Sequence, residues 1–183
     1  MHRPKLIIVG GSLAVGKTTL AKRLCGELGI HRISMDELKE HLFDYAGYQD
    51  RAWSRRIGQI TWPLFKELVD LHLSYGNDVV AEATFLWHDD AAWINSLKEK
   101  HGAELSLLWL TTDPRVARER FTERSKQERH PGHNDALEQV LEEFDEKYFN
   151  RTFIPLPIDG ETKIIDTTDF GSVDYEDITS FVS

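Results

Sequence analysis

The stretch VGGSLAVGKTTLAKRL, residues 9–24, decides the fold of this 183-residue chain. It begins as the end of an apolar strand (5–9), passes through glycines, and continues with helical spacing until Gly29. Glycines let the backbone curl so that successive N–H groups point into one concavity, and the following helix adds the positive end of its dipole. The stretch therefore predicts a phosphate-binding turn between a buried strand and a helix.

Residues 11–18 of this turn match the pattern G-x-x-x-x-G-K-[ST]. Lys17 has the length to reach the β- and γ-phosphates of a nucleotide, and the Thr18 hydroxyl is a ligand for Mg²⁺. ATP and Mg²⁺ are therefore the expected cofactors. The residues expected to bind ATP are Gly11, Ser12, Leu13, Ala14, Val15, Gly16, Lys17, Thr18 and Thr19.

The rest of the chain alternates short apolar runs with longer periodic segments, the pattern of a parallel α/β sheet with crossover helices. Strands are predicted at 5–9, 32–34, 78–83, 104–110 and 163–166. Helices are predicted at 17–28, 36–43, 51–75, 89–100, from 114 onward, at 134–149 and at 173–181. We expect Pro63 to disturb the long helix, 45–49 to be a loop, and Asp113-Pro114 to start a helix.

Composition narrows the class of protein. The formal net charge is -9, which disfavours nucleic acid as a partner because an acidic chain repels phosphodiesters. Cys25 is the single cysteine, so no intrachain disulfide forms. No run approaches the roughly 20 apolar residues of a membrane span, and the first apolar run is too short for a signal peptide. We expect one domain over residues 1–183, cytoplasmic and without a membrane partner.

The reaction class is narrowed by motifs that the sequence lacks. A GTPase carries an Asn-Lys-x-Asp base reader, and none is present. Asp44-Tyr-Ala-Gly47 fits D-x-x-G but lies beyond a predicted helix instead of at a strand end. Val79-Val80-Ala81-Glu82 lacks the Asp-Glu pair of a motor ATPase. A small phosphotransferase remains.

Asp36 follows the second predicted strand, where open α/β sheets present residues to the ligand crevice. A carboxylate there can accept the proton of a substrate hydroxyl or hold Mg²⁺ through water. Asp is also an ordinary N-cap for the helix that follows. Position alone leaves both interpretations open.

Arg120 and Arg124 share one helical face at i, i+4 spacing, next to the apolar side of their helix. Arginines on that side are expected to face an anion, such as a triphosphate in its transition state. Glu119 and Glu123 are the alternative partners.

These landmarks, the glycine loop, Asp36 and Arg120-x-x-x-Arg124, stand in an order that resembles the adenylate-kinase-like small-molecule kinases of the P-loop superfamily. The resemblance covers nearly the whole chain. It is strongest to bacterial kinases related to shikimate kinase, chloramphenicol phosphotransferase and the kinase domain of polynucleotide kinase. It implies a three-layer P-loop NTPase fold, sheet order 2-3-1-4-5, and ATP-dependent phosphate transfer to a small-molecule hydroxyl.

The resemblance also implies roles for residues. Asp36 matches the general base, and Lys17, Arg120 and Arg124 complete the catalytic set. The lid is the segment 125–134, and 44–75 is the substrate-clasping segment. Expected substrate contacts are Arg55, Arg56 and Glu82. Glu82 replaces an aspartate of many relatives, which leaves open whether it contacts Mg²⁺-bound water, the substrate or neither.

Two other functions remain as alternatives, a nucleotide-dependent regulatory ATPase and a 5′-OH polynucleotide kinase. Trp53, Trp62 and Trp87 flank the expected substrate crevice, where they either stack on a ring or pack within the cap. His130 and His133 lack a neighbouring third ligand, so a metal pair is disfavoured.

Overall fold

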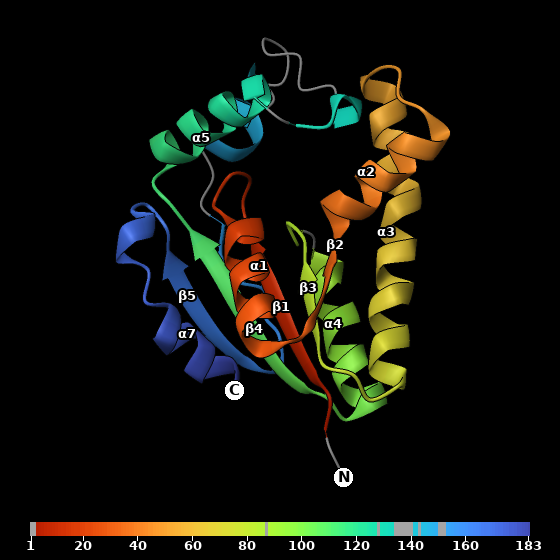
Figure 1. Ribbon diagram of the computed structural model, residues 1–183, viewed down its shortest axis with the longest axis vertical. Coiled ribbons are helices and arrows are strands. Elements are labelled where there is room, and N and C mark those ends of the chain that lie inside the picture. The colour runs from red at the N-terminus through yellow and green to blue at the C-terminus, as the bar shows by residue number, and fades with distance from the viewer. Residues whose placement is uncertain (1–2, 87, 128, 134–140, 143, 150–152) are drawn as a thin grey trace.

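The computed structural model describes residues 3–86, 88–127, 129–133, 141–142, 144–149 and 153–183. These residues form one parallel five-stranded sheet with helices on both faces (Figure 1). The strands are β1 (Lys5–Gly11), β2 (His31–Ser34), β3 (Val79–Glu82), β4 (Glu104–Thr111) and β5 (Glu161–Asp166). Their order is β2-β3-β1-β4-β5, which confirms the predicted fold class and topology.

Two helices cover each face of the sheet (Figure 1). They are α1 (Lys17–Leu28) and α7 (Tyr175–Val182) on one face, and α3 (Arg51–Ser74) and α4 (His88–His101) on the other. Strand β1 shows why, because Ile7 and Val9 pack toward α1 while Leu6 and Ile8 pack toward α3 and α4. A strand covered on both faces reads as a continuous apolar run, as 6–9 does.

Helices α2 (Met35–Ala46) and α5 (Pro114–Gln127) stand beyond the carboxyl ends of the strands, at the top of Figure 1. Asp113 caps α5 as predicted, because its carboxylate accepts a hydrogen bond of 2.8 Å from the Arg115 backbone N–H. Strand register aligns Val9, Glu82 and Ser34 across β1, β3 and β2. This edge is therefore where side chains from distant parts of the sequence meet.

Helix α3 differs from the sequence-based expectation because it runs without a break through Pro63. The rings of Trp62 and Phe65 stack 5.4 Å apart next to the proline and hold this turn against the sheet. Packing therefore outweighs the hydrogen bond that proline removes. Helix α2 extends to Ala46, so the predicted loop begins two residues later than expected.

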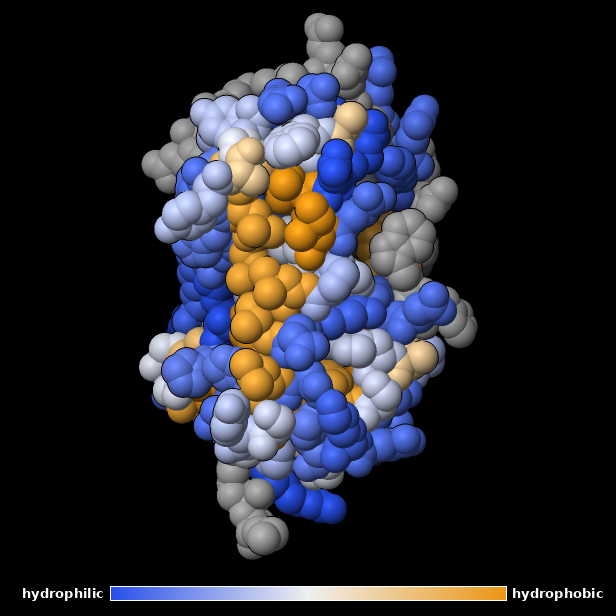
Figure 2. All heavy atoms as spheres, turned by 90° about the vertical axis from the view of Figure 1, so that its right-hand side faces the viewer, coloured by the Kyte–Doolittle hydropathy of each residue, from blue (hydrophilic) through white to orange (hydrophobic). Residues whose placement is uncertain are grey.

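Half of the predicted helix over 134–149 lies outside the described residues, and Asp145–Phe149 form a single π-helical turn. On the outer side of α3, Figure 2 shows an apolar stripe that includes exposed Ile60, Leu64 and Leu71. Within the described residues, no helix combines the length and apolar character needed to cross a bilayer.

Candidate active site

The glycine loop between β1 and α1 depends on glycine at two positions. Gly11 has φ of 133° and Gly16 has φ of 88°, conformations that L-residues rarely adopt. A Cβ at Gly11 would lie 2.3 Å from the Leu110 carbonyl oxygen, and one at Gly16 would lie 1.9 Å from the Phe170 ring. Neither position therefore accepts another residue without moving its surroundings.

Lys17 lies folded over this loop. Its ammonium group donates hydrogen bonds to the carbonyl oxygens of Ser12, at 2.6 Å, and Gly11, at 3.2 Å. Burial lowers the pKa of Lys17 to about 8, while Asp36 and Glu82 act in the opposite direction. Lys17 therefore stays mainly protonated at neutral pH, and a bound phosphate would strengthen that charge.

Glu82 closes the other side of the loop through a chain of polar contacts. The Thr18 hydroxyl donates a 2.5 Å hydrogen bond to one oxygen of Glu82. The other oxygen accepts a 2.6 Å bond from the guanidinium of Arg32, which also binds Glu37. Glu82 and Arg32 are 4% and 11% exposed, so the network is held in place by the sheet. It joins Thr18 on α1 to the first turn of α2.

The oxygen ligands near Thr18 fit a magnesium ion. Mg²⁺ prefers oxygen ligands and usually binds through one or two protein groups, substrate phosphates and water. The Thr18 hydroxyl would contact the ion, and the Glu82 carboxylate would accept hydrogen bonds from its water ligands. In the described part of the chain, no group of three or more His, Cys, Asp and Glu residues forms a metal cage.

Asp36 is the second residue of α2, and Ser34 holds the N-cap position. The alternative interpretation of Asp36 as the N-cap is therefore wrong, because the helix begins two residues earlier than an aspartate cap requires. The Asp36 carboxylate keeps 56% of its side-chain surface accessible and lies 3.8 Å from the Arg129 guanidinium. It is placed to meet a ligand inside the cavity.

The charges around Asp36 hold it ionised. Desolvation works to raise the pKa of Asp36, but the positive charges of Arg129, Lys17 and Arg124, together with His133 when it is protonated at low pH, outweigh desolvation and lower the pKa below its ordinary value. Asp36 therefore carries a negative charge at neutral pH. A carboxylate of low pKa accepts a proton from a hydroxyl group only as that hydroxyl becomes acidic during a reaction.

The segment 129–133 contacts α2 through two histidines. Arg129 donates to Nδ1 of His133 at 3.1 Å, because arginine has no acceptor. His133 Nε2 is then the donor to Glu40, at 2.9 Å. Burial lowers the pKa of His133 although the bond to Glu40 acts against this, so the ring is neutral at pH 7. Arg129 is thus fixed beside Asp36 in the first turn of α2.

A second contact reinforces this arrangement. His130 lies 3.1 Å from Asp44 and stacks on Phe43, with ring centroids 5.4 Å apart. A Cβ at Gly132 would lie 2.4 Å from the Phe43 ring, so only glycine allows this approach. Residues 129–133 of the expected lid therefore lie against α2.

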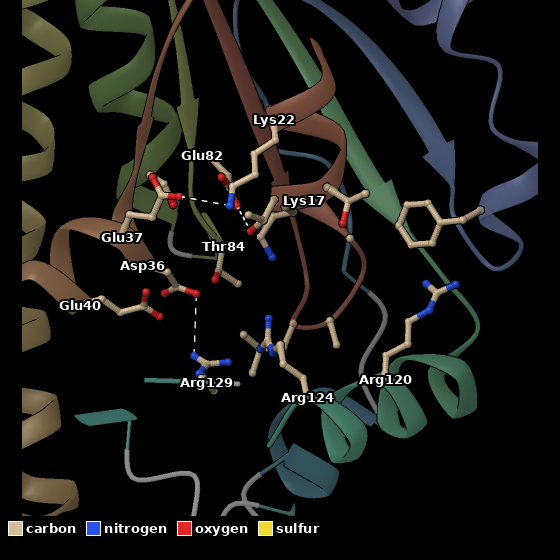
Figure 3. Close-up of a pocket in the computed structure, with 17 residues that line it drawn as sticks. Lys17, Lys22, Asp36, Glu37, Glu40, Glu82, Thr84, Arg120, Arg124 and Arg129 are labelled. Carbon is tan, nitrogen blue, oxygen red and sulfur yellow. Dashed lines mark hydrogen bonds and ion pairs between the residues drawn. The ribbon is translucent and has the colours of Figure 1, made fainter. Parts of the chain in front are cut away.

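Arg120 and Arg124 both line the cavity from α5, as their spacing predicted (Figure 3). Arg120 donates to the carbonyl oxygens of Thr167, at 2.8 Å, and Thr168, at 3.1 Å. Its guanidinium also lies 4.6 Å from the centre of the Phe170 ring. Arg120 is thus held against the loop after β5, and Arg124 is nearer to Lys17, Asp36 and Arg129 in Figure 3.

These side chains surround one cavity of about 600 Å³. It is lined by Leu13, Ala14, Gly16, Lys17, Thr18, Thr19, Lys22, Ser34, Asp36, Glu37, Glu40, Glu82, Thr84, Arg120, Arg124, Arg129 and Phe170. The glycine loop, Asp36, Glu82 and both predicted arginines of α5 are thereby brought together.

Other predicted residues lie elsewhere. Arg55 and Arg56 are exposed on α3 and are absent from the described lining, as are Trp53 and Trp62. Trp62 packs against the core, while the Trp53 indole N–H donates to the Gly47 carbonyl oxygen at 2.8 Å. Trp87 lies outside the described residues.

Several residues that line the cavity or contact its lining escaped the sequence reasoning. Arg32 stands in the short strand HRIS, and a charged residue inside a strand was the signal for a buried partner. Glu37 and Glu40 looked like solvent-facing residues of an amphipathic helix. His133 was considered only as a metal ligand, so its bond to Glu40 was missed.

The comparisons with known proteins agree with this geometry. Residues 6–148 match the sequence profile of the family AAA_33, described as an AAA domain. The chain belongs to this family. No curated protein gives a significant match. The matched region spans the glycine loop, Asp36, Glu82 and both arginines of α5, and it includes every described lining residue of the cavity except Phe170.

Solved structures share the fold over almost the full length. A candidate kinase from Chloroflexus aurantiacus J-10-fl is 31% identical with a TM-score of 0.87, over 98% of this chain and 96% of that one. A gluconokinase from Sinorhizobium meliloti 1021 is 18% identical with a TM-score of 0.55, over 98% and 90%. A sugar kinase from Janibacter sp. HTCC2649 is 16% identical with a TM-score of 0.58, over 97% and 91%.

The family and the first of these neighbours support a P-loop, nucleotide-binding protein of the small-molecule kinase type. The two more distant neighbours show that kinases of sugars and sugar acids are built on this fold. These two neighbours bear on the fold alone, because a shared fold does not fix a substrate.

Proposed function

We propose that this protein is an ATP-dependent phosphotransferase that moves the γ-phosphate of ATP to a hydroxyl of a small molecule, with Asp36 as general base. The observation that carries the proposal is the position of Asp36 across one cavity from Lys17 and Arg124. A regulatory ATPase has no need for an ionised carboxylate at that position.

The cavity supplies a partner for each charge in the reaction. The oxygen of the acceptor hydroxyl forms a bond to the γ-phosphorus while the bond from phosphorus to the β,γ-bridging oxygen breaks. ADP leaves with that electron pair, and the hydroxyl proton passes to Asp36. Lys17 and Arg124 face the negative charge on the transferred group, which is where fixed positive charges lower the barrier.

ATP and Mg²⁺ fit this site through its own residues. The backbone N–H groups of residues 11–18 would bind the phosphates, and Thr18 with Glu82 would hold Mg²⁺. The ion, when bound, neutralises charge between the phosphates. Phe170 and Arg120 line the end of the cavity next to the loop after β5 and would contact the adenine ring of ATP.

The decisive experiment is Asp36→Asn in a γ-phosphate transfer assay. Asn has almost the same size and cannot take a proton, so transfer should fall by about 10²–10⁴-fold, the usual contribution of general acid–base catalysis. ATP affinity should stay within a few fold, because the glycine loop is untouched. Asp89→Asn is the matched control, since Asp89 is an exposed first-turn residue of another helix, α4.

Other outcomes separate the alternatives. If Asp36→Asn transfers phosphate at the wild-type rate, Asp36 is not the base and the proposal loses its main support. Recovery of the rate at high Mg²⁺ would assign Asp36 to metal-bound water instead. A screen that includes 5′-OH oligonucleotides beside small hydroxyl compounds tests the polynucleotide kinase alternative directly, and ATP hydrolysis without transfer to any acceptor would favour a regulatory ATPase.

A further inference from the structure

The cavity has two unlike halves. All of its apolar lining residues, Leu13, Ala14 and Phe170, belong to the glycine loop or to the loop after β5. Among the described residues, the half formed by β2, α2, β3 and the lid is lined by side chains that form hydrogen bonds. These are Ser34, Asp36, Glu37, Glu40, Glu82, Thr84 and Arg129.

We infer that the acceptor is a small, hydroxyl-rich compound that is neutral or carries an amino group, such as a sugar, a sugar alcohol or an amino sugar. The inference rests on the proposed function, because it takes the half around Asp36 as the acceptor side. It excludes acceptors dominated by an aromatic ring and acceptors that need a carboxylate or phosphate bound in this half.

The lining explains the demand for hydrogen-bond donors. Four of the seven side chains are carboxylates, which are acceptors only when ionised. The pKa values of Asp36 and Glu40 are both lowered, Glu40 chiefly by its hydrogen bond from His133. These two groups therefore stay ionised at neutral pH, and a ligand has to meet them with O–H or N–H groups.

The carboxylates also remain accessible. The side chain of Asp36 is 56% exposed, that of Glu37 is 41% and that of Glu40 is 36%, although each has a partner. A carboxylate accepts about four hydrogen bonds, so one partner leaves capacity for ligand hydroxyls. An anionic ligand would instead face these carboxylates. The neighbouring cations already contact them, Arg129 at Asp36 and both Arg32 and Lys22 at Glu37, and His133 next to Glu40 is neutral.

The described residues of this half provide no stacking surface for a ring. Thr84 separates β3 from Phe85, which has φ of 46° and is only 2% exposed. Phe85 lies 6.0 Å from the Phe65 ring and 6.4 Å from the Trp93 ring, so its ring belongs to the core. Thr84 is thereby fixed as a polar wall of the cavity.

Calorimetric titration of the protein with Mg²⁺ and a non-hydrolysable ATP analogue tests this inference. The probes are glucose, glucitol, glucosamine and kanamycin, compared with gluconate, glucose 6-phosphate, shikimate and chloramphenicol. We expect at least one donor-rich probe to bind about 10-fold or more tightly than every anionic or aromatic probe. Tighter binding of an anionic or aromatic probe, or binding of none, overturns the inference.

Glu40→Gln adds a test of charge. Gln replaces one acceptor oxygen by a donor and removes the negative charge, so the preference for an amino-bearing probe over its neutral analogue should fall by about 10-fold. Glu99→Gln, exposed near the end of α4 at the opposite edge of the sheet, is the matched control and should change nothing. An unchanged preference in Glu40→Gln contradicts the inference.

Binding and phosphate transfer are measured separately, so a failure of the inferred acceptor class can be distinguished from a failure of the proposed function. If donor-rich probes bind but no phosphate moves to them or to any other acceptor, the proposed function fails and the recognition chemistry stands. If phosphate moves to gluconate or shikimate in preference to neutral polyols, the phosphotransferase stands and the acceptor class is wrong.

Discussion

The two halves of the cavity are built in different ways. The half that faces a nucleotide phosphate comes from one continuous stretch, residues 11–18, in which each group is a few residues from the next. The opposite half takes Ser34 from β2, Glu40 from α2, Glu82 from β3 and Arg129 from the lid. A motif built from neighbouring residues is recognisable from its spacing in the sequence. A site built from distant residues forms only when the chain folds.

The halves also differ in charge. Lys17, Arg120 and Arg124 surround the phosphate side, and carboxylates dominate the other (Figure 3). Arg32 and Arg129 are positive charges on the carboxylate side, and both bind carboxylates. The cavity is therefore polarised. In the proposed reaction, anionic ATP would bind on the positive side, and a phosphate acceptor rich in O–H and N–H groups would bind on the carboxylate side. The following predictions test that division.

The largest effect is expected from Lys17→Ala. Lys17 supplies the positive charge nearest the loop carbonyls, so its loss should lower phosphate turnover by about 10²–10³-fold or more. Thermal unfolding should stay close to wild type, because the side chain packs on no apolar core. Arg23→Ala on the same helix removes an exposed charge paired with Glu27 and is the control. Wild-type turnover would contradict the role given to the glycine loop.

Arg124→Ala should have the next largest effect. If Arg124 meets charge that develops during transfer, kcat should fall by about 10²-fold while ATP affinity changes by less than about 3-fold. Steady-state kinetics together with a direct binding measurement separates the two. Arg115→Ala is the control, since Arg115 is exposed on the same helix and outside this cavity. An equal loss of kcat and affinity would assign Arg124 to ground-state binding.

Arg32→Lys should change the metal requirement. Lysine keeps the charge but has one ammonium group, which cannot form the two-pronged bridge between Glu82 and Glu37. We expect the Mg²⁺ concentration for half-maximal nucleotide binding to rise about 10-fold, with the rate at saturating Mg²⁺ within about 3-fold. A Mg²⁺ titration that follows the amount of bound ADP measures this concentration without turnover. An unchanged requirement would show that Arg32 does not position Glu82.

The smallest effect concerns pH and the lid. The pKa of His133 in the folded protein is lowered from 6.5. The hydrogen bond from Arg129 to His133 is therefore fully present above about pH 6.5 and is lost as the pH falls through the folded pKa. Protonation removes the Nδ1 acceptor for Arg129, while Glu40 and Asp36 keep lowered pKa values. Hydrogen-exchange protection of 129–133 should therefore drop about 3-fold or more between pH 7 and pH 5.

His133→Gln is the matched variant for this prediction. Gln offers one acceptor to Arg129 and one donor to Glu40 but does not titrate in this range. Protection should then change with pH less than in the wild type. If both proteins lose protection equally, His133 is not the group whose protonation opens the contact.

The sequence predicted the phosphate side in detail because its parts are local. The pattern at 11–18, the strand before it and the helix after it are all within one stretch, and the structure has that geometry. Asp36 at the end of β2 and Arg120 and Arg124 on α5 were predicted to face the site, and all three line the cavity. Strand order came from the resemblance to P-loop kinases.

The parts that were missed depend on contacts between distant residues. Whether Arg55 meets the cavity is decided by how α3 packs, and the residue has no local signal for it. The place of Arg32 inside a strand indicates a buried partner, but only the packing of β2 against β3 makes that partner Glu82. The N-cap of α2 falls at Ser34 because β2 runs directly into the helix. Trp62 stacks on Phe65, so a residue that suited a ligand pocket became part of the core.

By itself, the sequence determined that a phosphate-binding turn opens a parallel α/β sheet, because glycine conformations and helix N-termini act over a few residues. Only the tertiary structure decided which carboxylates face that turn. Glu82 reaches Thr18 across 64 residues, and Glu40 meets His133 across 93. Such pairs form when packing of the sheet and helices brings their strands and loops together, and no short-range pattern in the chain encodes that approach.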